Sequence, residues 1–136
     1  MKVITSLLFL VLIANLFIVG TIASPEIATF VDENINNHQV TVFSKSYCPY
    51  CQRLVGLLKK LSIENVNVVQ LDQLADGFEI QQEVSSRSGS RTVPSLWIGQ
   101  QYVGGCDLAH KLHKTGELQK LLEQNNVKFV DFKDEL

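Results

Sequence analysis

Residues 44–52 read Ser-Lys-Ser-Tyr-Cys-Pro-Tyr-Cys-Gln and place two thiols, Cys48 and Cys51, three positions apart. The run before them, Val-Thr-Val-Phe at 40–43, is β-branched and aromatic, which is typical of a buried strand. After them the period changes, because apolar residues recur at helical spacing: Leu54, Val55, Leu58 and Leu61. The stretch therefore predicts a strand that turns into a helix at the two cysteines.

Cys48 falls at the expected start of that helix. Pro49 suits the first turn, where a backbone N–H has no helical partner. Free N–H groups and the positive end of the helix dipole favour an anion there, and the thiolate is the nucleophilic form of cysteine. We therefore expect the pKa of Cys48 to fall from about 8.5 into the range of about 3.5 to 7.5. Lys45 adds a nearby positive charge, and Cys51, one turn on, is the expected resolving thiol.

Two structural roles compete with redox chemistry at this pair. A structural zinc site normally takes four ligands, and the three Cys and three His include no second C-x-x-C or H-x(3–5)-H pair. A structural disulfide across two intervening residues closes too small a loop to restrict the unfolded chain much. Redox chemistry is therefore favoured, and no metal is expected.

The composition describes one small globular domain. The chain has 136 residues, 46% of them hydrophobic, and a net charge of −2. No strongly basic patch is visible, so we expect no nucleic-acid partner.

Residues 1–23 have the pattern of a secretory signal peptide. Lys2 is followed by no charged residue until Glu26, with an apolar run from Leu7 to Val19 between them. Small residues precede the expected cleavage point after Ala23. An uncleaved anchor is the alternative, since residues 3–23 hold 21 uncharged residues, just enough to cross a bilayer. Both interpretations send the domain into the lumen, and only the anchor implies a membrane contact.

The C-terminal tail, residues 126–136, ends in Lys-Asp-Glu-Leu at 133–136. This is the retention address of the endoplasmic reticulum. A charged, solvated tail is the alternative reading of these four residues. Because an entry signal is present at the other end, we expect the protein to reside in the lumen of the endoplasmic reticulum.

Strands alternate with helices along the rest of the chain. After the active-site helix, the pattern ends in a hairpin and two helices, which indicates an α/β fold with a mixed sheet covered on both faces. This is a thioredoxin-like fold, with a four-stranded mixed sheet flanked by helices. The expected helices cover about 25–37, 77–89, 108–112 and 118–122, and the other strands 65–71, 92–98 and 101–104.

Three motifs between residues 40 and 122 resemble those of dithiol glutaredoxins. They are Cys-Pro-Tyr-Cys at 48–51, Thr-Val-Pro at 92–94 and Gly-Gly-Cys-Asp at 104–107. They follow one another in the family's order, and the first differs from the Cys-Gly-Pro-Cys of thioredoxins. The resemblance implies a glutaredoxin domain over residues 24–125 that uses glutathione as cosubstrate.

The resemblance also implies a groove for glutathione. In the family the Val93–Pro94 peptide bond is cis, and the Val93 backbone pairs with the tripeptide. Taken singly, residues of these types more often have ordinary roles at the surface or as helix caps. Their joint placement in this sequence favours a binding function. The implied binding residues are Lys45, Tyr50, Gln81, Thr92, Val93, Pro94, Cys106 and Asp107.

The family assigns these residues to the two ends of glutathione. Lys45 and Gln81 would bind the glycine-end carboxylate, and Cys106 and Asp107 the γ-glutamyl end. The family often has a second acidic residue after Asp107, where this chain has Leu108. We expect Cys106 to be a packed residue beside the ligand rather than a third redox centre.

The predicted function is that of a glutathione-dependent thiol–disulfide oxidoreductase, and we expect a monomer. The Cys48 thiolate would attack the protein sulfur of a glutathione mixed disulfide, or one sulfur of a protein disulfide, and glutathione or Cys51 would resolve the intermediate. The expected partners are glutathionylated or disulfide-bonded lumenal proteins. A folding factor of the disulfide-isomerase type and a [2Fe–2S] scaffold, bridged by Cys48 from two chains, are the alternatives.

Overall fold

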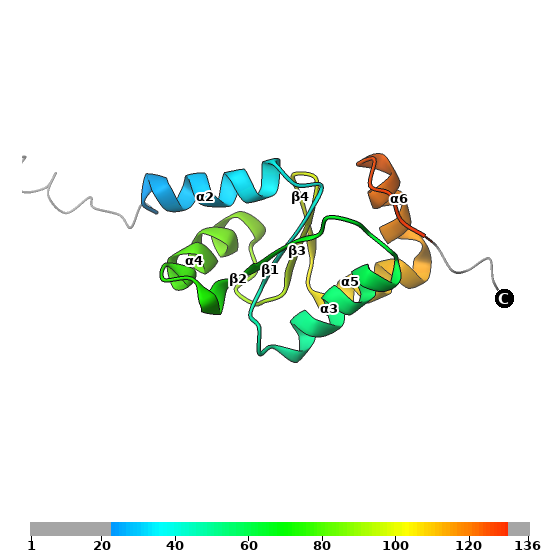
Figure 1. Cartoon of the computed structure of the whole chain (residues 1–136), viewed down its shortest axis with the longest axis horizontal. Coiled ribbons are helices and arrows are strands. Elements are labelled where there is room, and N and C mark those ends of the chain that lie inside the picture. The colour runs from blue at the N-terminus through cyan, green and yellow to red at the C-terminus, as the bar shows by residue number, and fades with distance from the viewer. Residues whose placement is uncertain (1–22, 131–136) are drawn as a thin grey trace, which may run out of the picture.

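The computed structural model describes residues 23–130, in which helices and strands alternate before a final hairpin and two helices (Figure 1). The predicted signal segment before Ala23 and the Lys-Asp-Glu-Leu ending lie outside the described residues. In chain order the elements are α2 (Pro25–Asn36), β1 (Val40–Ser44), α3 (Pro49–Lys60), β2 (Asn67–Gln70), η1 (Leu71–Gln73), α4 (Gly77–Ser88), β3 (Ser95–Ile98), β4 (Gln101–Gly104), α5 (Cys106–Thr115) and α6 (Glu117–Gln124).

The four strands form one mixed sheet, as predicted, and their order in the sheet is β2-β1-β3-β4. β1 pairs in parallel with β2, whereas β3 is antiparallel to both β1 and β4. Because β1 and β2 run the same way, the loops that follow them leave the sheet at the same edge. The thioredoxin-like α/β fold expected from the sequence is confirmed.

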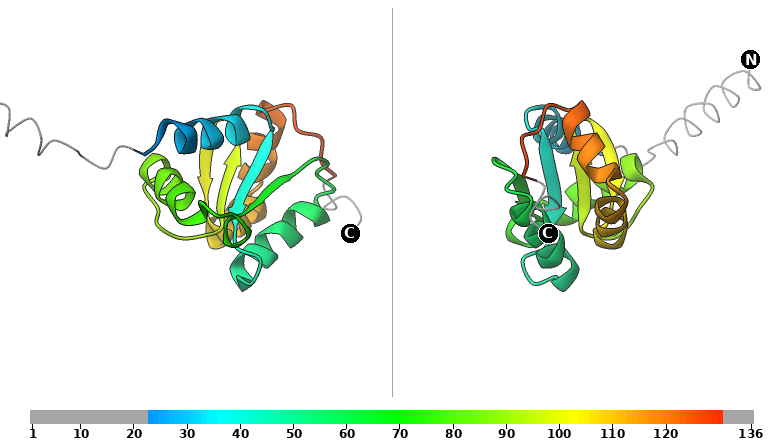
Figure 2. Two further views of the ribbon diagram at one scale, coloured as in Figure 1. Left: turned by 60° about the vertical axis from the view of Figure 1, so that its left-hand side comes forward. Right: turned by 90° about the vertical axis from the view of Figure 1, so that its right-hand side faces the viewer.

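Helices cover both faces of the sheet, with α2 and α4 on one and α3, α5 and α6 on the other (Figure 1). Figure 2 shows these layers from two further directions. The central strand β1 is buried along its whole length and serves both cores. Val40 and Val42 pack in the core beneath α3 and α5, whereas Phe43 packs in the core beneath α2 and α4. This double burial explains why apolar residues of β1 point to both faces of the sheet.

Two strands are shorter than the sequence predicts. β2 begins at Asn67 rather than near residue 65, because Asn65 has a left-handed φ of 59° that does not fit a strand. β3 begins at Ser95 rather than Thr92, and the residue just before it, Pro94, has no N–H to donate to a ladder. Residues 92–94 therefore form a connection that is free to line the site.

The packed part of the chain extends past the predicted domain limit at residue 125. Val127 is buried in the core beneath α3, and the Val130 N–H donates to the Leu61 carbonyl at 2.8 Å. The Gln39 side chain also holds the Asn125 and Asn126 carbonyls. Within residues 23–130, no helix is both long and apolar enough to cross a membrane.

Candidate active site

The two cysteines of residues 48–51 lie where the sequence predicts, at the start of α3. Cys48 is the N-cap of the helix, in an extended conformation, and Pro49 is its first residue. The Cys48 N–H donates to the Lys45 carbonyl at 3.1 Å, which closes a tight turn over residues 45–48, called here the thiol turn. The Cys48 carbonyl in turn accepts the Gln52 N–H at 3.1 Å and begins the helical hydrogen bonding.

The environment of Cys48 favours its thiolate. Partial burial acts to raise the pKa of Cys48, but hydrogen bonds from the Cys51 N–H, the Cys51 thiol and the Tyr50 N–H outweigh it. The charge of Lys45 acts in the same direction, so that the pKa of Cys48 lies below its ordinary value. The expected direction of this shift is confirmed. Cys48 is half-buried, which leaves its sulfur within reach of a substrate.

Cys51 has the opposite character. Its side chain is buried, with 1% of its surface exposed, and it is a free thiol like Cys48. Burial raises the pKa of Cys51, and donation of its thiol hydrogen to Cys48 adds to the rise. A protonated thiol that hydrogen-bonds to a neighbouring thiolate suits a group that acts after the first attack.

Six of the eight predicted glutathione residues line one cavity of about 390 Å³. Its walls come from the start of α3, from the connection before β3 and from the start of α5. The Val93–Pro94 peptide bond in this wall is cis, as expected. The charge of Cys48 acts on Cys106, so the cavity lies within electrostatic range of the nucleophile. The six predicted residues are Tyr50, Thr92, Val93, Pro94, Cys106 and Asp107.

Lys45 and Gln81 do not line this cavity. Lys45 faces a second recess of about 390 Å³ on another side of α3, together with Cys51. Gln81 is half-buried on α4, and its Nε2 donates to the Arg91 carbonyl at 3.2 Å. Gln81 therefore supports the connection that carries Thr92 and Val93, and its amide is partly engaged within the protein.

Cys106 is a packed residue, as expected. Only 4% of its surface is exposed, and burial raises its pKa. Its sulfur lies 3.6 Å from Nδ1 of His110, and that nitrogen is 2.8 Å from the Cys106 carbonyl oxygen. The shorter contact marks Nδ1 as the donor to the carbonyl, so the imidazole is no base for this thiol.

Similarity to known proteins identifies the family. The sequence model of the family described as "Glutaredoxin" matches residues 40–103. Glutaredoxin-C2 of Arabidopsis thaliana is 45% identical over 92 residues, covering 68% of this chain and 82% of that protein. Glutaredoxin-C4 of the same plant is 37% identical over 116 residues, covering 85% of each chain. The chain belongs to the glutaredoxin family.

Solved structures agree with this family and with the fold. The crystal structure of a buckwheat glutaredoxin–glutathione complex is 33% identical, with a TM-score of 0.69 over 76% of this chain and 96% of that one. The holo form of glutaredoxin C1 from Populus tremula x tremuloides is 34% identical, with a TM-score of 0.70 over 77% and 96%. As a glutaredoxin, the protein is a glutathione-dependent thiol–disulfide oxidoreductase.

Two residues outside the predicted set of glutathione-binding residues also line the glutaredoxin cavity. Gly105 and Leu108 also line it, and Leu108 is 43% exposed there. The guanidinium carbon of Arg53, one turn beyond Pro49, lies 5.8 Å from the centroid of the Tyr50 ring, within the range of a cation–π contact. The only available signal for Arg53 was its spacing of three residues from Tyr50 on one helix face.

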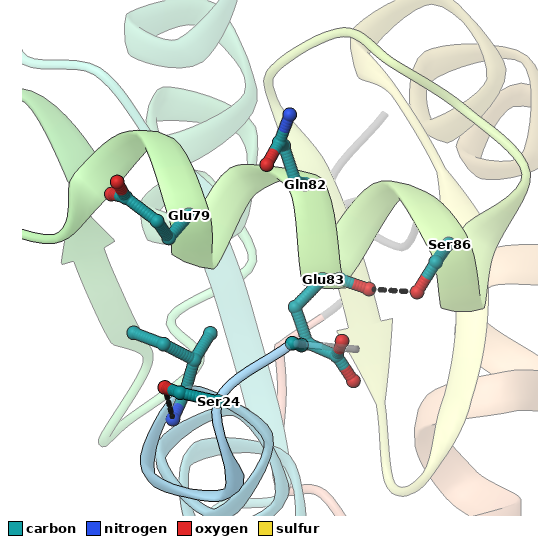
Figure 3. A pocket seen from close by; sticks show the side chains of 7 residues that line it. Ser24, Glu79, Gln82, Glu83 and Ser86 are labelled. Atoms are coloured by element: carbon teal, nitrogen blue, oxygen red, sulfur yellow. Dashed lines mark hydrogen bonds between the residues drawn. The ribbon is translucent and has the colours of Figure 1, made fainter. Parts of the chain in front are cut away.

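A further recess of about 460 Å³ lies between the start of α2 and α4, away from the cysteines of this glutaredoxin (Figure 3). None of the predicted site residues lines it. Its Glu83 carboxylate is paired with Arg87 at 2.7 Å, and Arg87 also contacts Asp32 on α2. These contacts join the two helices, so we assign this recess a structural role.

Proposed function

We propose that this glutaredoxin acts on protein–glutathione mixed disulfides and protein disulfides in the lumen of the endoplasmic reticulum, with glutathione as cosubstrate. The observation that carries the chemical part is the stabilised Cys48 thiolate at the start of α3, next to a cavity whose walls match the family's glutathione motifs. The buckwheat relative has been solved as a complex with glutathione, which supports the same ligand for this cavity.

The reaction on a mixed disulfide follows from the chemistry of Cys48. Its thiolate attacks the glutathionyl sulfur, the S–S bond breaks, and the protein leaves as a thiolate that takes up a proton. A second glutathione thiolate attacks the resulting Cys48–glutathione disulfide, which releases oxidised glutathione and regenerates the Cys48 thiolate. Attack on the protein sulfur, as predicted from the sequence, would leave the protein on Cys48 instead. That attack belongs to the dithiol route, in which Cys51 then displaces the protein.

The proposed binding roles divide the cavity between the two ends of glutathione. Thr92, Val93 and Pro94 form the wall along the tripeptide, and the backbone N–H groups of Cys106 and Asp107 at the start of α5, together with the Asp107 carboxylate, bind the γ-glutamyl end. Lys45 and the Gln81 amide bind the glycine carboxylate. Because both lie outside the cavity that the other six share, glutathione has to extend past Cys48 to reach them.

The two chain ends support the lumenal location. Residues 1–23 have the pattern of a signal peptide or anchor, and Lys-Asp-Glu-Leu at 133–136 is a retention address. Glutaredoxins have potentials of about −200 to −230 mV, and the endoplasmic reticulum is poised at about −180 to −210 mV. The difference corresponds to about 2 kcal/mol or less for two electrons, so the enzyme can run in both directions. Deletion of residues 133–136 is expected to send the protein into the culture medium, and retention of the truncated protein would contradict the proposed address.

The catalytic proposal is tested by a glutathione-coupled assay on a glutathionylated protein. Cys48→Ser is expected to lose activity by at least about a thousandfold, because serine supplies no thiolate. Cys51→Ser is expected to keep more than about a third of it, since the glutathione route does not need the second thiol. Loss of turnover in Cys51→Ser alone would contradict the glutathione route.

A bound iron–sulfur group is the second candidate, and the relative from Populus tremula x tremuloides, solved in a holo form, shows that a protein of this family can carry a bound group. Among residues 23–130, no group of three or more His, Cys, Asp or Glu side chains could hold a metal within one chain. A [2Fe–2S] cluster would therefore require Cys48 and glutathione from two chains. A brown purified protein that absorbs visible light would support the cluster, and we expect a colourless protein because Pro49 follows Cys48.

A further inference from the structure

Ser46, in the middle of the thiol turn, is held by groups from two other elements. Its N–H donates to Asp72 Oδ1 at 2.8 Å, and its hydroxyl donates to Asp72 Oδ2. Its carbonyl accepts a hydrogen bond from Nε2 of Gln52 at 3.1 Å. A single residue of the turn is therefore tied to η1 by two hydrogen bonds and to α3 by a third.

The sheet topology brings these groups together. β1 and β2 are parallel neighbours, with Ser44 opposite Gln70 at their carboxyl ends. The thiol turn follows β1 directly and η1 follows β2 directly, so both leave the sheet at the same edge. Asp72 thus reaches the turn from a neighbouring strand end, although it lies 26 residues away in the sequence.

The short helix η1 is a fixed support for Asp72. Leu71 beside it is 2% exposed and belongs to the core beneath α2 and α4. The Leu71 carbonyl accepts the Leu74 N–H at 3.3 Å, and a Cβ at position 77 would overlap that same carbonyl. Gly77 therefore lets the start of α4 press directly against η1, which leaves η1 little freedom to move.

We propose that Asp72 is a positioning residue for the reaction: by holding Ser46 it fixes the thiol turn and so sets how Cys48 meets the N–H groups at the start of α3. The turn spans only residues 45–48, and its closing hydrogen bond joins Cys48 to Lys45. A shift of Ser46 therefore moves Cys48 relative to the Tyr50 and Cys51 N–H groups, which stabilise its thiolate. Asp72 itself touches no reacting atom.

The negative charge of Asp72 has its own effect on the Cys48 thiolate, and the experiment must separate it from the effect of the hydrogen bonds to Ser46. The hydrogen bonds from Ser46, together with the charge of Lys45, hold the pKa of Asp72 below its ordinary value, so this carboxylate is ionised at working pH. A negative charge near the thiol turn opposes the thiolate, whereas the hydrogen bonds to Ser46 favour it. The other titratable groups that act on Cys48 are Lys45, Cys51 and Cys106.

Two substitutions at one position separate these effects. Asp72→Asn removes the charge but keeps an oxygen that can accept the Ser46 N–H, whereas Asp72→Ala removes both. The matched control is Asp76→Ala. Asp76 lies in the same segment, and its carboxylate makes no capping hydrogen bond to α4, so this variant removes a nearby charge without removing such a bond. The readouts on the purified chain are the pH profile of Cys48 alkylation by iodoacetamide and kcat/KM with a glutathionylated protein.

We expect the pH midpoint of Cys48 alkylation to be higher in Asp72→Ala than in Asp72→Asn. We also expect kcat/KM of Asp72→Ala to be about threefold to tenfold below that of Asp72→Asn, the size of a lost hydrogen bond. Ser46→Ala loses only the hydroxyl donor, so its kcat/KM should lie between those of wild type and Asp72→Ala. This variant carries the same test if Asp72→Ala does not fold. Asp76→Ala should match wild type. Coincident pH profiles of the Ala and Asn variants, with only the melting temperature changed, would overturn the proposal. Because alkylation needs no glutathione, this result is independent of the proposed substrates.

Discussion

Two helices of this protein begin with a cysteine, and the two thiols differ in their chemistry. Cys48 at the start of α3 has a lowered pKa, whereas Cys106 at the start of α5 has a raised one. Both lie at the positive end of a helix dipole. Cys48 is the N-cap and is half-buried, and the N–H groups of Tyr50 and Cys51 act to lower its pKa, whereas Cys106 is the first helical residue and is buried in the core. A helix start stabilises a thiolate only when the sulfur faces the free N–H groups and keeps some contact with solvent.

The largest expected difference between the two helix starts is in alkylation rate. Because the pKa of Cys48 is lowered and that of Cys106 is raised, the rate of Cys48 alkylation by iodoacetamide should rise at lower pH than the rate of Cys106 alkylation. At neutral pH we expect Cys48 to react at least about a hundredfold faster, since burial also slows Cys106. Mass spectrometry of the alkylated peptides measures both rates in one sample. Equal rates at neutral pH would contradict the comparison.

The next effect concerns the positive charge of Lys45 beside the start of α3. Lys45→Gln is expected to raise the KM for a glutathione mixed disulfide about threefold to tenfold, through the loss of a charge-assisted hydrogen bond, with kcat changed less than about twofold. The pKa of Cys48 should rise only slightly, because Lys45 is the weakest of the groups that lower it. Steady-state kinetics at two salt concentrations measures this effect, and the KM of the variant should depend less on salt. A lower kcat at unchanged KM would show that Lys45 acts on the chemical step instead.

A smaller effect is expected from adding a charge to the α5 start. Leu108 is 43% exposed beside Asp107 on the cavity wall, at a position where the family often has a second carboxylate. Leu108→Asp should lower the KM for glutathione about twofold to threefold, because a second carboxylate can bind the γ-glutamyl ammonium. Leu108→Asn is the matched control without the charge. An unchanged KM in Leu108→Asp would show that the γ-glutamyl end does not reach this residue.

The local features of the site were predictable from the sequence, because neighbouring residues determine them. The β-branched run before Ser44, the proline after Cys48 and the helical period that follows specify the strand, the turn and the helix without any distant contact. Spacing also sufficed for the break between α5 and α6, where Gly116 has a φ of 82° that suits glycine. The order of the strands and helices then indicated a mixed sheet covered on both faces.

Contacts between distant segments were not predictable from spacing. The hydrogen bonds between Ser46 and Asp72 depend on the parallel register of β1 and β2, which no local pattern reports. The packing of Val127 beneath α3 was missed for a similar reason, since residues after 125 have no helical or strand period. The family motifs indicated the shared cavity, but they did not indicate that Lys45 would face a different recess.

The smallest expected effect is that of removing the second helix-start thiol. Cys106→Ala should leave glutathione-coupled activity within about twofold of wild type and cost about 1 kcal/mol of unfolding free energy, as for loss of one small buried group. Cys106→Ser should cost more, because its hydroxyl would enter apolar surroundings. Denaturant unfolding and the coupled assay on both variants separate packing from chemistry. A tenfold loss of activity in Cys106→Ala at nearly unchanged stability would mean that this thiol takes part in the reaction, and burial would then be a poor guide to which helix-start cysteine reacts.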